Sequence, residues 1–329
     1  MNITVLGSGG WGTALAILLA DNGHKPTLWS PFKEEVTTLK QAGENPLLPG
    51  ITLPASFEYT SDIGVVSKAQ LILLVTPSFA IAETIALAKP HLKADTPIVI
   101  ATKGIKPDTH QTFYELLRTE LGAHAPLAVL SGPSHAEEVA RKIPTACVAA
   151  SEDEALAKLV QNVFMNERFR VYTSTDIIGV ELGAALKNVI ALAAGISDGL
   201  GFGDNTIAAL ITRGLDEISS LAHALGGKRE TLAGLAGLGD LIVTCTSKHS
   251  RNRKAGVFIG QGLSVSDAME QVGAVVEGYY ATHAAYELAQ KTKIELPICQ
   301  GLYAILYEHK NPEQVVWDLM TREKKSELS

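Results

Sequence analysis

Cysteine is scarce in this 329-residue chain. The three cysteines, Cys147, Cys245 and Cys299, lie far apart and lack the CxxC spacing of a structural zinc site. Their number and spacing also exclude a disulfide framework, which favours a reducing compartment. We therefore predict a cytoplasmic protein without a metal site.

The chain also lacks an excess of positive charge. It carries 28 Lys and Arg against 35 Asp and Glu, a formal net charge of −7. Non-specific nucleic-acid binding needs a broad positive field, so we expect no nucleic-acid partner, and local cations must bind any anionic ligand. We expect neither an export signal nor a membrane span, because no basic segment precedes the apolar residues 3–6, and Lys187 and Asn188 interrupt the most apolar later stretch.

The first half of the chain alternates short apolar runs with longer helical patterns, which is typical of a doubly wound α/β sheet. Hydrophobic residues make up 46% of the chain, enough for two cores. We predict a dinucleotide-binding Rossmann domain over residues 1–180 and a mostly α-helical domain over residues 181–329 for substrate binding and catalysis. The predicted strands cover residues 3–6, 27–29, 71–75, 98–101 and 127–130, with 146–149 and 169–172 as extensions. The predicted later helices cover residues 179–197, 205–225, 266–271, 279–291 and 298–307.

A glycine-rich loop directly follows the first predicted strand. Residues 7–12 read Gly-Ser-Gly-Gly-Trp-Gly and open a helical run, the context in which a GxGxxG pattern predicts dinucleotide binding. Gly7 suits the tight turn, Gly9 lets a pyrophosphate approach the backbone, and Gly12 lets the helix pack closely on the sheet. The alternative is a turn that merely needs glycines.

The end of the second predicted strand bears on the choice of cofactor. NAD-specific proteins carry an acidic residue there for the ribose hydroxyls, whereas residues 29–33 here read Trp-Ser-Pro-Phe-Lys. Because no carboxylate is present in this stretch, we slightly favour NADP over NAD, with Ser30 or Lys33 as contacts for a 2′-phosphate. Lys33 equally fits an ordinary solvated helix residue.

Ligands of open α/β sheets bind beyond the carboxyl ends of the strands, and three such ends carry suitable residues, at 75–78, 101–104 and 130–134. Lys103 follows the fourth predicted strand, an unusual place for lysine unless it reaches a ligand or a carboxylate. Gly132 and Ser134 follow the fifth strand and are candidates for a small polar pocket. A plain helix cap at Ser134 is the alternative.

Lys187 is the one long amine on a helix side made of small residues. At 100° per residue it shares that side with Gly183, Ala184, Ala191, Ala194 and Asp198. A face of this kind leaves space for a ligand, and a lysine on it can donate a proton if its surroundings tune its pKa. The alternative is a solvated lysine on the helix exterior.

Two later segments suggest a charged ligand. Asp240 follows a glycine-rich turn, and residues 248–254 form the densest cationic stretch of the chain. Arg251, flanked by Ser250 and Asn252, suits bidentate recognition of a phosphate, with a solvated basic loop as the alternative. Glu277 carries no independent functional signal.

Taken together, these residues resemble the bacterial NAD(P)-dependent glycerol-3-phosphate dehydrogenases over nearly the whole chain. The resemblance implies a cytoplasmic oxidoreductase acting on a CH–OH group. Its reaction would be reversible hydride transfer from NAD(P)H to dihydroxyacetone phosphate, giving sn-glycerol 3-phosphate for glycerophospholipid biosynthesis. The matching stretches are residues 7–14, 101–104, 131–134, 183–189, 210–215, 237–241 and 250–253.

The resemblance also implies roles for individual residues. Lys187 would be the catalytic acid and base, with Lys103 and Asp240 beside the reacting centre. The substrate would contact those three residues and Gly132, Ser134, Ser250, Arg251 and Asn252. The cofactor would contact Gly7, Gly9, Gly10, Trp11, Gly12, Lys103, Ala136, Arg251, Val275 and Glu277.

Two other functions are compatible with parts of this sequence. Related 6-phosphogluconate or 3-hydroxyisobutyrate dehydrogenases also use a helix lysine, but they favour Asn four residues after it, where this chain has Ala191. A non-catalytic NAD(P)-binding sensor is the other alternative, but it would have no use for proton transfer and so for the set Lys103, Lys187, Asp240 and Arg251. Members of the resembled family often carry Arg or His where this chain has Ser30 to Phe32. A homodimer is an expectation taken from the family.

Overall fold

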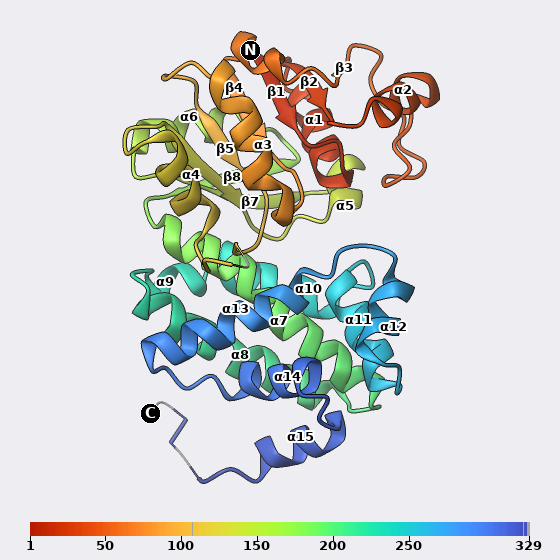
Figure 1. Cartoon of the computed structure of the whole chain (residues 1–329), viewed down its shortest axis with the longest axis vertical. Coiled ribbons are helices and arrows are strands. Elements are labelled where there is room, and N and C mark those ends of the chain that lie inside the picture. Colours follow the sequence, from red (N-terminus) through yellow and green to blue (C-terminus); the bar gives the residue numbers. More distant parts are fainter. Residues whose placement is uncertain (107, 325, 328–329) are drawn as a thin grey trace.

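The computed structural model describes residues 1–106, 108–324 and 326–327. It has two parts, a sheet flanked by helices and an assembly of helices, which lie one above the other along the longest axis (Figure 1). The sheet has the order β3-β2-β1-β4-β5-β6-β7-β8. The strands are β1 (Asn2–Leu6), β2 (Lys25–Trp29), β3 (Glu58–Thr60), β4 (Leu71–Leu74), β5 (Ile98–Ile100), β6 (Leu127–Ser131), β7 (Thr145–Ala150) and β8 (Phe169–Ser174).

The sheet confirms the predicted fold class. Its first six strands have the order of a doubly wound Rossmann sheet and are parallel, whereas β7 pairs antiparallel with β6. β1 and β4 are neighbours although β2 and β3 lie between them in the chain, so the chain reverses its direction of winding there. The carboxyl ends of β1 and β4 therefore form the switch point where such sheets bind ligands.

Buried apolar runs explain the central strands. Every residue of β4, β5 and β6 is buried, as expected for strands covered by helices on both faces. β3 was not predicted, because its three residues, Glu-Tyr-Thr, lie at the sheet edge and form no apolar run. The flanking helices are α1 (Gly10–Asp21), α2 (Lys33–Ala42), α3 (Ile81–Ala88), α4 (Phe113–Leu121), α5 (Ala136–Ala140) and α6 (Glu154–Phe164), with short 3-10 turns η1 (Ile63–Lys68), η2 (Ser78–Ala80) and η3 (Lys89–His91).

The second part is built around α7 (Ile177–Gly199), whose residues are almost all buried. β8 ends at Ser174, so residue 180 falls within the first turn of α7, and the domain division at 180 stays a prediction. The surrounding elements are α8 (Asp204–Ala224), α9 (Arg229–Leu232), the π-helical turn η4 (Leu235–Gly239), α10 (Asp240–Thr246), α11 (Arg251–Gly260), α12 (Val265–Val272), α13 (Glu277–Thr292), α14 (Pro297–Tyr307) and α15 (Pro312–Met320).

The small residues of α7 serve mainly for close helix packing. A Cβ at Gly195 would lie 2.1 Å from the Arg253 carbonyl oxygen, and a Cβ at Gly256 would lie 2.2 Å from the Leu192 carbonyl oxygen. The backbones of α7 and α11 therefore approach each other directly. Ala191 and Ala194 are also fully buried. The prediction that this side of α7 leaves space for a ligand is wrong over this stretch, because α11 and the core fill it.

α7 is also long and apolar enough to cross a membrane. However, 89% of its apolar window is buried inside the protein. Such burial is typical of the central helix of a folded core, and the apolar character of α7 is explained by the helices packed around it.

Candidate active site

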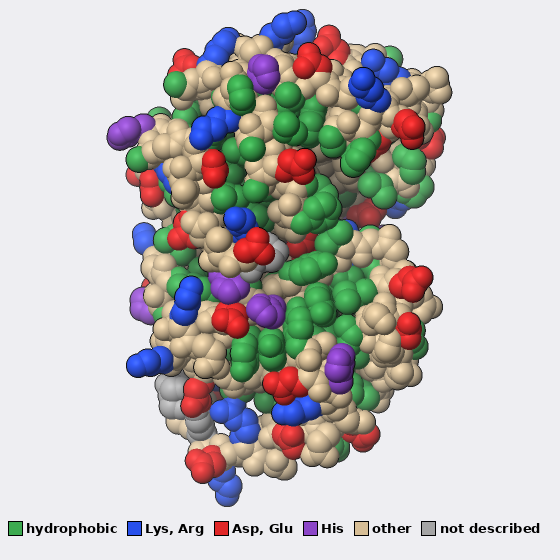
Figure 2. Space-filling model, viewed as in Figure 1, with side chains coloured by type: hydrophobic (Ala, Val, Ile, Leu, Met, Phe, Trp, Pro, Cys, Tyr) green, Lys and Arg blue, Asp and Glu red, His purple; other side chains and the backbone are tan. Residues whose placement is uncertain are grey.

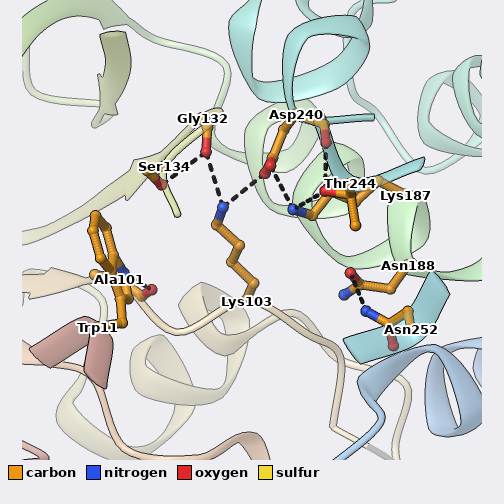
Figure 3. A network of polar contacts seen from close by, with 10 residues as sticks. All are labelled: Trp11, Ala101, Lys103, Gly132, Ser134, Lys187, Asn188, Asp240, Thr244 and Asn252. Atoms are coloured by element: carbon orange, nitrogen blue, oxygen red, sulfur yellow. Dashed lines mark hydrogen bonds and ion pairs between the residues drawn. The ribbon is translucent and has the colours of Figure 1, made fainter. Parts of the chain in front are cut away.

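Lys103 joins the sheet to the helical part at a buried carboxylate. It follows β5 at the carboxyl edge of the sheet. Figure 2 shows that the surface is indented between the two parts of the molecule. Lys103 Nζ donates hydrogen bonds to the Gly132 carbonyl oxygen at 2.9 Å and to Asp240 Oδ2 at 2.7 Å (Figure 3). Its side chain is only 19% exposed. The sequence predicted that Lys103 reaches a ligand or a carboxylate, and in the structure it binds the carboxylate of Asp240.

Lys187 binds the other oxygen of the same carboxylate. Its Nζ lies 2.5 Å from Asp240 Oδ1 and 2.9 Å from Thr244 Oγ1 (Figure 3). Thr244 in turn donates to the Asp240 carbonyl oxygen at 2.6 Å. Lys187 is 6% exposed, so the alternative of a solvated lysine is wrong. We call Lys103, Lys187, Asp240 and Thr244 the lysine network.

Tight turns bring Asp240 to the two lysines. A Cβ at Gly237 would lie 2.0 Å from the Leu232 carbonyl oxygen, so η4 can close only with glycine there. A Cβ at Gly183 would lie 2.8 Å from the Ala236 carbonyl oxygen, so this glycine lets η4 approach α7. π-helical turns occur often at functional sites, and this one places Asp240 at the start of α10.

The lysine network holds two ammonium groups and one carboxylate. Burial lowers the pKa of Lys187 to about 8, and nearby Lys103 acts in the same direction, whereas Asp240 opposes the shift. Burial alone would raise the pKa of Asp240, but the two ammonium groups outweigh it and hold this pKa below its ordinary value. The network therefore carries an excess positive charge that a nearby anion would neutralise.

The loop after β6 lies beside the lysine network. Ser134 Oγ donates to the Gly132 carbonyl oxygen at 2.9 Å, and α5 begins only at Ala136 without a side-chain cap (Figure 3). The alternative of a helix cap at Ser134 is therefore wrong. Gly132 has φ of 144°, and a Cβ there would lie 2.9 Å from the Cys147 backbone, so only glycine fits. His135 Nε2 is buried without a hydrogen-bond partner among the described residues, which leaves a polar group available near the site.

The glycine-rich loop forms a cradle at the switch point. Gly7 has φ of 124° and donates to the Trp29 carbonyl oxygen, while a Cβ at Gly12 would lie 2.1 Å from the Gly7 carbonyl oxygen. Nothing lies within 4 Å of a Cβ built on Gly9, and no described side chain caps the start of α1. The free N–H groups and open space fit the pyrophosphate of a dinucleotide.

Two residues connect this loop to its surroundings. Trp11 Nε1 donates to the Ala101 carbonyl oxygen at 3.2 Å, so α1 is fixed to the strand end that carries Lys103 (Figure 3). A Cβ on Gly10 would lie 3.2 Å from the Leu47 carbonyl oxygen, which leaves room only for a small residue.

A carboxylate does lie beside the end of β2, contrary to the expectation from residues 29–33. Glu35, in the first turn of α2, accepts a hydrogen bond from Ser30 Oγ at 2.5 Å and another from Ser8 Oγ at 2.7 Å. Glu35 lies beyond residues 29–33 in the sequence, but the first turn of α2 brings it back against Ser30. The premise for favouring NADP is therefore wrong.

The cationic stretch is ordered at the start of α11. Ser250 caps the helix by accepting from the Arg253 N–H, and Arg251 is exposed on its first turn. Asn252 is 8% exposed, donates to Asn188 Oδ1 at 2.9 Å and accepts from the Gly278 N–H at 2.7 Å. The alternative of a loosely solvated basic loop is therefore wrong for these residues.

Glu277 links the two parts of the protein. It starts α13, and its two carboxylate oxygens share the hydrogen bond that Ser78 Oγ donates, at 2.8 and 2.9 Å, close to the end of β4. Burial raises its pKa, and the hydrogen bond from Ser78 opposes that shift. Val275 lies half-buried two residues before α13, and Ala136 starts α5.

The structure brings some predicted residues together and leaves others apart. Lys103, Lys187, Asp240 and Gly132 share direct hydrogen bonds. Among the described residues, these four form no direct hydrogen bond with Ser250, Arg251 or Glu277. Sequence reasoning marked the strand end that carries Ser78 but gave Ser78 no role, and it missed Asn188, Glu35 and Thr244. Thr244 lies four residues after Asp240 and so on the same helix face.

The lysine network, and not the size of a cavity, identifies the site. Two hollows of about 480 and 340 Å³ lie elsewhere on the sheet part, and neither contains a residue of the network. Among the described residues, no group of three His, Cys, Asp or Glu side chains is placed to hold a metal ion. The groups that the lysine network itself offers are two ammonium groups, one carboxylate and one hydroxyl.

Comparison with known proteins gives consistent matches along the chain. A family model described as NAD-dependent glycerol-3-phosphate dehydrogenase N-terminus matches residues 2–157, and the corresponding C-terminus model matches residues 176–317. The glycerol-3-phosphate dehydrogenase [NAD(P)+] of Fusobacterium nucleatum is 50% identical, with 100% of this chain and 99% of the relative covered. The enzyme of the same description from Geobacillus thermodenitrificans is also 50% identical, with coverage of 100% and 97%. The crystal structure of glycerol-3-phosphate dehydrogenase from Coxiella burnetii is 44% identical, with a TM-score of 0.94 and coverage of 98% and 99%.

Proposed function

Since the chain belongs to the NAD-dependent glycerol-3-phosphate dehydrogenase family, we propose that Lys187 is the proton donor of its reaction. The protein is an oxidoreductase that reversibly reduces dihydroxyacetone phosphate to sn-glycerol 3-phosphate with NAD(P)H. The observation that supports the role of Lys187 is the buried contact of its ammonium group with Asp240, beside Lys103.

The residues present fit the dinucleotide. The N–H groups at the start of α1 would hold the pyrophosphate, and Gly9 leaves the space for it. Bound NAD(P)H supplies the hydride that reaches C2 of the substrate. Gly7, Gly10, Trp11 and Gly12 shape this part of the site, and Ala136, Val275 and Glu277 would border it from the neighbouring elements.

Lys187 would deliver a proton to the C2 oxygen as negative charge develops on it. Two of its three N–H donors bind Asp240 and Thr244, so one remains for the substrate. Asp240 holds the ammonium group in one orientation, while Lys103 adds positive potential at the developing alkoxide. In the oxidation direction, the neutral amine of Lys187 would accept the proton.

The remaining predicted residues would bind the substrate away from the reacting carbon. Arg251 is the exposed cation for the phosphate, with the Ser250 hydroxyl and the second N–H of Asn252 beside it. Gly132 and Ser134 would border the substrate near Lys103. Binding of the remote phosphate would position the carbonyl for reaction.

The cellular setting remains part of the proposal. A cytoplasmic enzyme would provide sn-glycerol 3-phosphate as the backbone of glycerophospholipids. A homodimer is the proposed assembly, and a domain division near residue 180 is proposed from the change in sequence pattern.

The test is the oxidation of NADH and, separately, NADPH at 340 nm with dihydroxyacetone phosphate. 3-Phosphohydroxyacids serve as control substrates. We expect rapid turnover with dihydroxyacetone phosphate and none with the control substrates. Lys187→Met should lower kcat by at least about 100-fold and leave dinucleotide binding intact. A kcat within about tenfold of the unmodified enzyme, roughly 1.4 kcal/mol, would overturn the role of Lys187.

A further inference from the structure

Glu35 lies beside the glycine-rich loop and the end of β2, the region in which Rossmann proteins bind the ribose next to the adenine. The Gly7 N–H donates to the carbonyl oxygen of Trp29, the last residue of β2, so the glycine-rich loop and this strand end are in direct contact. Ser8, within the loop, and Ser30, directly after β2, both donate to the Glu35 carboxylate. The acidic residue of NAD-specific Rossmann proteins occupies the end of this same strand.

The two serines fix the carboxylate and leave it able to bind more. Ser8 and Ser30 are 5% and 2% exposed, so their hydroxyls are held in place by the protein. Each bonds a different oxygen of Glu35, while the glutamate itself is only half-buried. A carboxylate accepts about four hydrogen bonds, so about two acceptor positions remain, enough for the two hydroxyls of one ribose.

A 2′-phosphate at this position would meet a negative charge. Among the described residues, no cation forms an ion pair with Glu35, and Ser30 already donates to it. Lys33, at the start of α2, is exposed to solvent. An exposed lysine is screened by salt more than a half-buried carboxylate, so it offsets the repulsion only in part.

We propose that Glu35 makes this enzyme select NAD over NADP, by accepting the ribose hydroxyls of NAD and repelling the 2′-phosphate of NADP. This selection rests on the proposed function, because it assumes that the dinucleotide lies along the glycine-rich loop. It depends on a residue outside the lysine network and concerns the choice of cofactor and not the chemical step.

The test measures dissociation constants for NADH and NADPH by nucleotide fluorescence, without substrate. In the unmodified protein, the constant for NADPH should exceed that for NADH by at least about fivefold at low salt, and the ratio should shrink at high salt. Glu35→Gln should lower the ratio by at least about threefold, mainly through tighter NADPH binding. Glu34→Gln removes the same charge from the neighbouring exposed position and should leave the ratio unchanged.

Two results would overturn the selection by Glu35. One is a ratio of the two dissociation constants below about fivefold in the unmodified protein, and the other is a change of this ratio in Glu35→Gln that is no larger than in Glu34→Gln. If Glu35→Gln fails to fold, a ratio below about fivefold in the unmodified protein still overturns the selection, and Glu35→Asp is the second variant that tests the position of the carboxylate. Equal binding of both dinucleotides with normal turnover refutes only this inference. Failure of both dinucleotides to bind would instead refute the proposed cofactor site, and with it the proposed function.

Discussion

Two carboxylates, Asp240 and Glu35, lie in different regions of the protein, and each is held by two donors from other segments. Asp240 binds the ammonium groups of Lys103 and Lys187, whereas Glu35 binds the hydroxyls of Ser8 and Ser30. The first arrangement leaves an excess positive charge, and the second leaves a negative charge.

The difference shows that the charge of the donors, more than the geometry of the carboxylate, sets what each site can bind. Around Asp240, the two ammonium groups can stabilise an alkoxide that forms during the reaction. Around Glu35, neutral hydroxyls position the carboxylate but do not neutralise it, so it favours hydroxyl donors and disfavours phosphate.

Removing the carboxylate from the lysine network should give the largest effect. In Asp240→Asn, the two lysines lose their shared anion, and we expect kcat for reduction of dihydroxyacetone phosphate to fall by at least about 100-fold. Steady-state kinetics would measure the loss. Asp216→Asn breaks an exposed ion pair with Arg213 on α8 and serves as the matched control. Similar kcat values for the two variants would remove Asp240 from the proposed mechanism.

The pH dependence tests the charge of Lys187. Burial lowers its pKa to about 8, so the ammonium form is present below pH 8 and is lost above it. We expect kcat/KM for reduction to fall above pH 8 by about tenfold per pH unit, whereas that for oxidation rises up to pH 8 and then levels off. Profiles of both directions measure this. If both directions changed in the same sense with pH, Lys187 would not be the shared proton donor and acceptor.

Glu181 is a third buried acidic side chain, and it forms no ion pair with an ammonium group among the residues that the structure describes. It accepts from the Tyr114 N–H at 3.1 Å, and burial raises its pKa from 4.5 to about 8. Between pH 4.5 and about pH 8, Glu181 is deprotonated in the unfolded chain but still protonated in the folded protein. The free energy of unfolding should therefore decrease as pH rises through this window, by up to about 1.4 kcal/mol per pH unit.

Urea denaturation of Glu181→Gln between pH 5 and pH 8 measures this contribution. The variant should lose stability less steeply with rising pH than the unmodified protein. Glu230→Gln, at an exposed position of α9, should keep the original slope. Equal slopes in all three proteins would contradict the raised pKa of Glu181.

Much of the fold was predictable because buried parallel strands are continuous apolar runs. The central strands and α7 lie within two residues of their predicted ends. β3 was missed because an exposed edge strand of three residues has no such pattern. The small residues of α7 were misread, since a face that can admit a ligand can equally admit another helix backbone.

Lys103, Lys187 and Asp240 were each singled out in the sequence, and the family resemblance implied that they lie near one another, but the hydrogen bonds that join them were not predictable. Lys103 and Lys187 are distinguished by their unusual positions on a strand end and on a small-residue helix face. Their shared partner Asp240 lies 137 and 53 residues further along the chain. Glu35 was missed for a similar reason, because only the folded first turn of α2 shows that it points back to Ser30. Pairing across such distances depends on tertiary structure.

The smallest effect concerns Thr244, the neutral member of the lysine network. Its hydroxyl accepts from Lys187 Nζ at 2.9 Å and helps to orient the ammonium group, without adding charge. Thr244→Val keeps the shape but removes this acceptor, so we expect kcat to fall by about fivefold, near 1 kcal/mol, with little change in KM. Thr244→Ser restores the hydroxyl and should recover most of the activity. Equal activity of the Val and Ser variants would show that the charged partners alone position Lys187. The contrast with Glu35, whose carboxylate accepts from the neutral hydroxyls of Ser8 and Ser30, would then become sharper.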